Sequence, residues 1–187
     1  GHATGLSVSE LAGGRFAEIL PTYVSGIRGN DDAERVDKAT AFVEAGVRRI
    51  KLHLGADIRT DLATYDAIRA VHPDLDLALD AHWTYLLGEA KALGRELDDR
   101  RAWFFEAPLA PEDVEGHRDL AASLATPIAV GEAMRSRFEF TDWLARRAVG
   151  LTQPDIGRTG ITEGLAIAAV ADAFHAQVAP HHSAAFG

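Results

Sequence analysis

The sequence contains no cysteine among its 187 residues, which excludes disulfide bonds and thiolate metal ligands. Basic residues are outnumbered, with 19 Lys and Arg against 28 Asp and Glu, so the net charge is −9. Without a basic stripe, nucleic acid is not an expected partner. No apolar stretch approaches the roughly 18 residues that cross a membrane, and no signal-peptide pattern is visible. These absences predict a cytoplasmic protein with no nucleic-acid or membrane partner.

Short apolar runs alternate with helical patterns in one order along the chain, seven times. The first helical pattern begins near Asp32 and stops at Gly46, the second stops before Pro73, and an alanine-rich one covers about residues 162–174. Continuous apolar strands that alternate with helices predict a parallel sheet covered on both faces. The near-constant repeat favours a closed TIM-type (β/α) barrel over an open sheet. The seven runs span residues 18–24, 49–54, 77–80, 103–106, 128–132, 150–155 and 177–181.

The predicted barrel is incomplete. Residues 1–14 read as a short helix and turn that lead into it, and residues 15–187 form the barrel domain. A full barrel has eight strands and about 250 residues, and an open edge would expose hydrogen-bonding groups and core. We therefore expect that the chain is part of a longer protein, or else that another element closes the gap; the first is favoured.

Three acidic residues, Asp80, Glu106 and Glu132, follow one another at intervals of 26 residues, and each ends an apolar run. A βα unit of a barrel takes about that many residues, because strand, loop, helix and loop must all fit. Barrel active sites form where the carboxyl ends of the strands meet. Carboxylate oxygens suit Mg²⁺, which prefers octahedral oxygen coordination and leaves positions for a substrate. The spacing therefore predicts a Mg²⁺ site at the barrel mouth.

The flanking strands also end in ionisable residues. Lys51 and His53 are two residues apart, hence on one face of a strand, and His82 comes two residues after Asp80. A random solvated rim would mix charges of all kinds, whereas this one has acids in the middle and histidines and a lysine on either side. The pattern predicts an acid–base site around the metal.

Asp155 and His181 end the sixth and seventh apolar runs, which are neighbours in the predicted sheet. A carboxylate beside a histidine fixes the imidazole tautomer and raises its basicity, so this pair is a candidate catalytic dyad. His182 and Arg137 are candidate substrate contacts.

The motifs that contain these residues are Lys51-Leu52-His53, Asp80-Ala81-His82, Phe105-Glu106-Ala107-Pro108, Gly131-Glu132, Gln153-Pro154-Asp155 with Gly160-Ile161-Thr162-Glu163, and Ala179-Pro180-His181. Together they resemble the mandelate racemase subgroup of the enolase superfamily, from about residue 8 to the end of the chain. The resemblance implies a TIM-type barrel with seven βα units visible, whereas the family's capping domain and eighth strand are absent from this chain. It also implies a homo-oligomer that acts on a small acid sugar.

The resemblance assigns roles to individual residues. It implies Mg²⁺ bound by the three spaced acids, and a catalytic dyad of Asp155 and His181. His82 is similar to the general acid of galactonate-type sugar-acid dehydratases, and Lys51 is expected to contact the substrate carboxylate. The resemblance also implies the family's mechanism, in which a Lys or His base works with Mg²⁺.

Two positions depart from the family pattern. The second strand often carries Lys-x-Lys, whose second lysine is a base, and here that position is His53. The usual Glu-Glu-Pro reads Glu106-Ala107-Pro108, which removes an acid behind the metal ligands. Because the capping domain carries most of the substrate selectivity, the identity and stereochemistry of the acid sugar stay open.

The main prediction is a Mg²⁺-dependent dehydratase of aldonic or aldaric acids. His181 would take the proton α to the carboxylate, and His82 would protonate the departing β-hydroxyl to give a 2-keto-3-deoxy acid. One alternative is a racemase or epimerase, with His53 as the base opposite His181. A cycloisomerase is less favoured, since those enzymes use a lysine on the sixth strand, which here ends at Asp155. The other alternative is a non-catalytic barrel that binds a metal or a partner. The remaining histidines are expected at the surface: His2, His72, His117 and His175.

Overall fold

The computed structural model describes residues 1–53 and 57–181 of the chain. Seven strands form one parallel sheet in sequence order, so each βα unit places its strand beside the previous one. The strands are β1 Val24–Ser25, β2 Arg49–His53, β3 Asp76–Asp80, β4 Phe105–Glu106, β5 Ile128–Val130, β6 Leu151–Thr152 and β7 Gln177–Val178.

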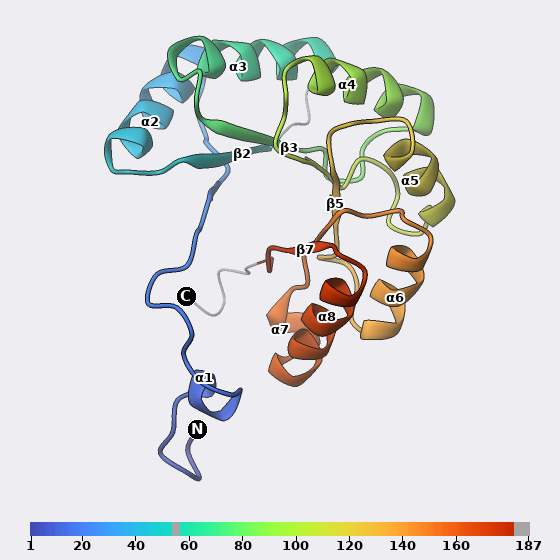
Figure 1. Ribbon diagram of the computed structural model, residues 1–187. Helices are drawn as coiled ribbons and strands as arrows, with labels where there is room; N and C mark the ends of the chain where they lie inside the picture. The colour runs from blue at the N-terminus through green and yellow to red at the C-terminus, as the bar shows by residue number, and fades with distance from the viewer. Residues whose placement is uncertain (54–56, 182–187) are drawn as a thin grey trace.

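Most of the helices cover the outer, convex side of the sheet, which curls into a half-barrel, whereas the short helix near the N-terminus lies away from it (Figure 1). This arrangement confirms the predicted (β/α) barrel with seven units. At several helix starts, a side chain accepts hydrogen bonds from backbone N–H groups that have no partner inside the helix. Asp31 does so for α2 and Asp57 for α3. The helices are α1 Val8–Leu11, α2 Asp32–Glu44, α3 Ile58–Val71, α4 Leu87–Asp99, α5 Val114–Ala121, α6 Arg137–Ala145, α7 Ile156–Thr159 and α8 Ile161–Ala173.

The strands are mostly shorter than the apolar runs that predicted them. The first run was expected over residues 18–24, but pairing begins only at Val24, after Pro21, which has no N–H to donate. Apolar character reports burial, and only part of a buried run joins the ladder. The short helix α1 falls within the predicted lead-in, and the division at residue 14 stays a prediction.

The core has two layers because side chains alternate along each strand. Leu77 and Leu79 of β3 pack outward in the large cluster under the helices. Ala78 points the other way and packs inside the barrel with Phe104 and Ala129. The polar residues at the carboxyl ends of the strands therefore lie above an apolar floor.

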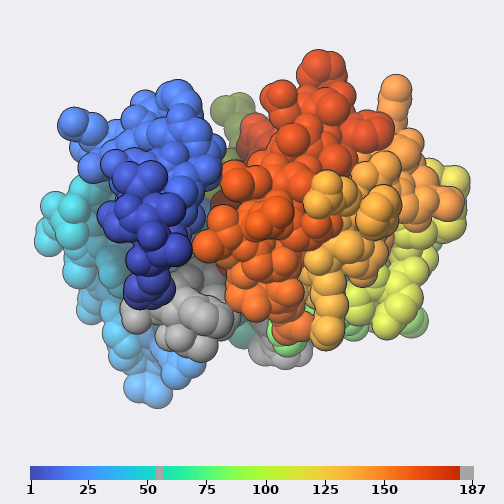
Figure 2. All heavy atoms as spheres, turned by 90° about the horizontal axis from the view of Figure 1, so that it is seen from below, coloured from blue at the N-terminus to red at the C-terminus, as the bar shows by residue number. Residues whose placement is uncertain are grey.

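One side of the half-barrel is open. A cavity of about 940 Å³ separates the β1 side from the β7 side, and its lining includes Lys51, His53 and His181. Figure 2 shows the N-terminal segments, in blue, facing the orange and red C-terminal units across this hollow. Among the residues described, no helix is both long and apolar enough to span a membrane.

We expect Leu77→Ala to lower the free energy of unfolding by about 2–5 kcal/mol, because the side chain is fully buried and its removal leaves a cavity. The control is Leu86→Ala, since Leu86 is 76% exposed and should change stability by no more than about 0.5 kcal/mol. Urea unfolding of the intact protein measures both. Equal losses in the two variants would contradict the described packing of β3.

Candidate active site

The parallel register brings the ends of β2, β3 and β4 together. His53 pairs with Asp80 across β2 and β3, and Asp80 pairs with Glu106 across β3 and β4. Asp80 and Glu106 are 4% and 1% exposed, so both carboxylates lie in the barrel rather than in solvent. Glu132 follows β5 on the same rim, with its side chain 22% exposed. The structure thus places the three spaced acids at one end of the sheet.

Lys51 lies between two of these acids. Its Nζ is 3.0 Å from Asp80 Oδ2 and 2.7 Å from Glu106 Oε1. Burial lowers the pKa of Lys51, but the two carboxylates outweigh burial and hold that pKa above its ordinary value, so the side chain is an ammonium. The contact with a substrate carboxylate stays a prediction, because in this structure Lys51 is engaged by protein carboxylates.

Glu106 is held at both oxygens. Lys51 donates to Oε1, and Gln153 Nε2 donates to Oε2 at 2.6 Å. Burial and the nearby charge of Asp80 nevertheless raise the pKa of Glu106 to about 7. Lys51 and Gln153 oppose this shift in pKa without cancelling it.

The donor chemistry fits a divalent cation. Three carboxylates and one ammonium leave two negative charges, and carboxylate oxygens are the ligands that Mg²⁺ prefers. Across residues 1–53 and 57–181, no three histidine or carboxylate groups are arranged to chelate an ion as they stand. On donor type and charge, the residues that fit this role are Asp80, Glu106 and Glu132.

Asp155 and His181 form a hydrogen-bonded pair at the neighbouring strand ends. His181 Nδ1 lies 2.9 Å from Asp155 Oδ2, and the two residues also share a parallel β-bridge. Burial opposes ionisation of Asp155, but hydrogen bonds from His181 and from the backbone N–H groups of Gly157 and Arg158 keep the pKa of Asp155 below its ordinary value. The anionic Asp155 thus fixes the orientation of the imidazole and leaves Nε2 toward the mouth, 3.1 Å from Glu132 Oε2.

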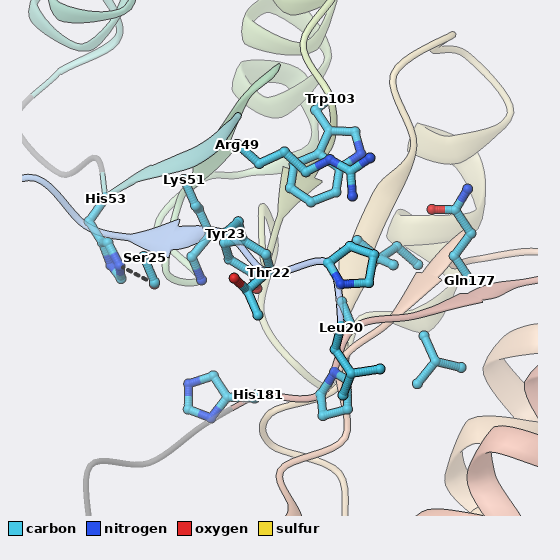
Figure 3. A pocket seen from close by; sticks show the side chains of 15 residues that line it. Leu20, Thr22, Tyr23, Ser25, Arg49, Lys51, His53, Trp103, Gln177 and His181 are labelled. Carbon is cyan, nitrogen blue, oxygen red and sulfur yellow. Dashed lines mark hydrogen bonds between the residues drawn. The ribbon is translucent and has the colours of Figure 1, made fainter. Parts of the chain in front are cut away.

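The two other predicted histidines lie nearer solvent. His82 Nδ1 is 4.0 Å from Glu132 Oε1, and its side chain is 74% exposed. His53 Nδ1 is 3.5 Å from Asp80 Oδ2, and its Nε2 is 3.1 Å from Ser25 Oγ. Burial lowers the pKa of His53, although Asp80 opposes this shift. Figure 3 shows His53 and Ser25 on one wall of the cavity and His181 on the other.

The structure gives Arg137 another partner. Its Nη2 lies 2.6 Å from Glu163 Oε2, and its backbone N–H donates to Glu163 Oε1, so the residue joins α6 to α8. The substrate contact predicted for Arg137 stays a prediction, and His182 lies outside the described residues.

A family model described as enolase C-terminal domain-like matches residues 34–187. The chain belongs to this family. D-galactonate dehydratase from Variovorax paradoxus is 35% identical over 97% of the chain, and D-galactarolactone cycloisomerase from Agrobacterium fabrum is 34% identical over 97%. The crystal structure of L-talarate dehydratase from Polaromonas sp. JS666, complexed with Mg and L-glucarate, has a TM-score of 0.89 at 31% identity and covers 97% of the chain and 52% of that structure. The chain spans about half the length of the curated relatives it matches, 50% in both cases.

The match confirms the resemblance to the enolase superfamily. A relative named as a cycloisomerase is about as similar to the chain as one named as a dehydratase, so overall similarity does not choose between the two reactions. That a cycloisomerase is less favoured, because the sixth strand carries no lysine, stays a prediction.

Several contacts of this enolase-superfamily barrel carried no signal in the sequence. The hydrogen bonds between Ser25 and His53 and between Trp83 and Glu132 join residues of different βα units. No sequence motif predicted them. Gln153 stood in a recognised motif, but its hydrogen bond to an acid of the fourth strand was not predicted.

The surface position expected for His117 is wrong. The side chain is fully buried, and its ring packs between those of Trp83 and Trp143. The error arose because the residue lies on the inner face of α5, where an aromatic ring fills space under the loops. Burial lowers the pKa of His117 from its ordinary 6.5, although a hydrogen bond to the Asp113 carbonyl opposes the shift.

We expect His117 to make stability depend on pH. Its pKa is lower in the folded protein than in the unfolded chain, so stability is fully present above about pH 6.5 and is lost as the pH falls toward the folded pKa. The unfolding free energy of wild type should therefore fall more steeply below pH 6.5 than that of His117→Gln. His175→Gln, at an exposed turn, is the control and should keep the wild-type slope. Parallel slopes for wild type and His117→Gln would contradict the buried neutral histidine.

Gly131 permits the close contact of β5 and β6 just before Glu132. A Cβ on Gly131 would lie 2.7 Å from the backbone N and C of Gln153, and its φ of 150° is one that side-chain-bearing residues rarely adopt. We expect Gly131→Ala to lower the unfolding free energy by about 1–3 kcal/mol and to weaken divalent-cation binding, because the backbone beside Glu132 must move. The control is Gly150→Ala, whose Cβ would meet Pro127 at an ordinary 3.6 Å. Thermal unfolding and Mn²⁺ titration measure the two effects, and a Gly131→Ala protein that matched the control in both would contradict this reading.

Proposed function

We propose that this chain is the barrel portion of a Mg²⁺-dependent dehydratase of acid sugars, an aldonate or aldarate hydro-lyase. The observation that carries the proposal is the position of two histidines about one carboxylate. His181 Nε2 lies 3.1 Å from Glu132 Oε2, and His82 Nδ1 lies 4.0 Å from Glu132 Oε1. A dehydratase needs a base and an acid on one substrate, and both histidines flank the same candidate metal ligand. The names of two similar proteins, D-galactonate dehydratase and L-talarate dehydratase, agree with the reaction class.

Asp80, Glu106 and Glu132 would hold the cation. A bound Mg²⁺ supplies positive charge where the substrate carboxylate gains negative charge as the neighbouring carbon loses its proton. The protein keeps the ligands in place. Lys51 and Gln153 donate hydrogen bonds to the two oxygens of Glu106, and these bonds restrict rotation of the carboxylate.

His181 would remove the proton α to the substrate carboxylate through Nε2. Asp155 supports this step, since its carboxylate orients the ring through Nδ1 and stabilises the imidazolium that forms. His82 would donate a proton to the β-hydroxyl, which leaves as water. The product is a 2-keto-3-deoxy acid.

A second candidate is an epimerase or cycloisomerase of the same superfamily. His53 favours it, because this ring lies across the cavity from His181 and is oriented by Ser25 and Asp80 (Figure 3). Two bases on opposite walls are what proton removal from one face and return to the other require. The similarity to a protein named D-galactarolactone cycloisomerase supports the same alternative.

We expect the intact protein with Mg²⁺ to form a 2-keto acid from at least one member of a library of aldonic and aldaric acids. His181→Asn should lower kcat by about 10²–10⁴-fold, because the imidazole that takes the proton is lost while part of the side-chain volume is kept. His175→Asn is the matched control, since this exposed histidine follows α8 far from the mouth, and its rate should equal wild type.

Three other outcomes would each replace the dehydratase. Exchange of the α-proton in D₂O without keto acid would indicate an epimerase. Exchange with consumption of a sugar lactone would indicate a cycloisomerase. Divalent-cation binding with neither exchange nor product would leave the non-catalytic barrel.

A further inference from the structure

Trp83 contacts the candidate metal ligand Glu132 from a different βα unit. Trp83 lies in the loop between β3 and α4, and its indole Nε1–H donates to Glu132 Oε1 at 3.1 Å. The other oxygen of Glu132 faces His181 Nε2 at 3.1 Å. The two carboxylate oxygens therefore have different nearest neighbours: the indole N–H at Oε1, with His82 Nδ1 farther away at 4.0 Å, and the dyad histidine at Oε2.

The indole is itself held firmly. The backbone N–H of Trp83 donates to the Ala107 carbonyl at 2.6 Å, and its φ of 63° is unusual for a bulky residue. Its ring meets that of His117 at 6.5 Å between centroids, and His117 packs at 4.8 Å against Trp143. His117 and Trp143 are 0% and 7% exposed, so the indole rests on a buried aromatic stack.

Glu132 needs such a support more than the other two acids do. Lys51 pairs with both Asp80 and Glu106, whereas Glu132 stands at the start of the loop after β5, with its side chain 22% exposed. A carboxylate with free side-chain torsions loses entropy when it binds an ion, and a fixed hydrogen bond on one oxygen removes that cost in advance. A neutral N–H leaves the negative charge on Glu132 available to a cation. A lysine in the same place would cancel that negative charge.

We propose that Trp83 is a positioning residue: its indole N–H, with the ring resting on His117, fixes Glu132 so that the second oxygen stays directed toward His181 and the barrel mouth. This hydrogen bond thereby raises the affinity of the site for a divalent cation. This inference rests on the proposed metal site, and it concerns a residue that no motif of the sequence marked.

The test is Mn²⁺ binding to the intact protein without substrate, followed by electron paramagnetic resonance of the free ion. Trp83→Phe keeps an aromatic ring on His117 but removes the N–H donor, and the Kd for Mn²⁺ should rise about 10–100-fold. The matched control is Trp143→Phe, the same substitution on the far side of His117, which removes no hydrogen bond to Glu132. Its Kd should stay within about twofold of wild type, whatever its effect on thermal stability.

A second measurement separates positioning from mere packing. With Glu132 already changed to Gln, the added Trp83→Phe substitution should not weaken Mn²⁺ binding further, because the two residues act through one contact. A Trp83→Phe protein that binds Mn²⁺ as wild type does, or a Trp143→Phe control that loses as much affinity, would overturn the inference alone. If wild type binds no Mn²⁺ at all, the proposed metal site falls, and the inference falls with it.

Discussion

The ammonium of Lys51, buried between the carboxylates of Asp80 and Glu106, is the interaction on which the barrel mouth depends. A charge taken out of water costs several kcal/mol unless it is paired, and here one lysine pairs with acids from the next two strands. The parallel register of β2, β3 and β4 brings the three groups together, so these ion pairs support the same register that creates them. The balance is unequal, because one ammonium faces two carboxylates. Burial and the charge of Asp80 raise the pKa of Glu106 to about 7, and a further positive charge at this end of the sheet would oppose that shift.

The backbone at the strand ends is bent in ways that cost free energy. His82, Trp83 and Ala107 all have positive φ, at 45°, 63° and 46°, and they follow candidate ligands by one to three residues. Such conformations cost on the order of 1–3 kcal/mol each and persist only where the surroundings impose them. Here the ladder imposes them: the N–H of Ala81 donates to the Glu106 carbonyl, and the N–H of Trp83 donates to the Ala107 carbonyl. The bends direct side chains of successive βα units toward one mouth.

The two walls of the cavity have different chemistry. The β6 and β7 wall carries the dyad of Asp155 and His181, and the β1 and β2 wall carries Ser25 and His53 (Figure 3). Proteins named as a dehydratase and as a cycloisomerase are almost equally similar to the chain, so overall likeness does not select a reaction. A barrel of this kind changes its chemistry through the groups at the carboxyl ends of its strands. Under the proposed function, the reaction would depend on which of these histidines faces the reacting carbon.

The sequence by itself determined the architecture and the residues available at the mouth. The interval of 26 residues among Asp80, Glu106 and Glu132, with apolar runs before each, was enough to predict three successive strands that end at or just before these acids, because a βα unit has a nearly constant length. Such periodicity is local, and it reports which face of an element is buried. It does not report which side chains of different units touch.

Only the tertiary structure decided those contacts. Separate loops and helices meet in space, and their meeting determines three features. Trp83 donates to Glu132, Lys51 lies between two acids, and His117 is buried. Such contacts depend on loop conformations and side-chain torsions. Because the partners lie tens of residues apart in the chain, their contact produces no periodic pattern in the sequence. Spacing along the chain was thus sufficient to predict about where the strands end. The packing of the chain in three dimensions was required to determine which side chains contact one another at those ends.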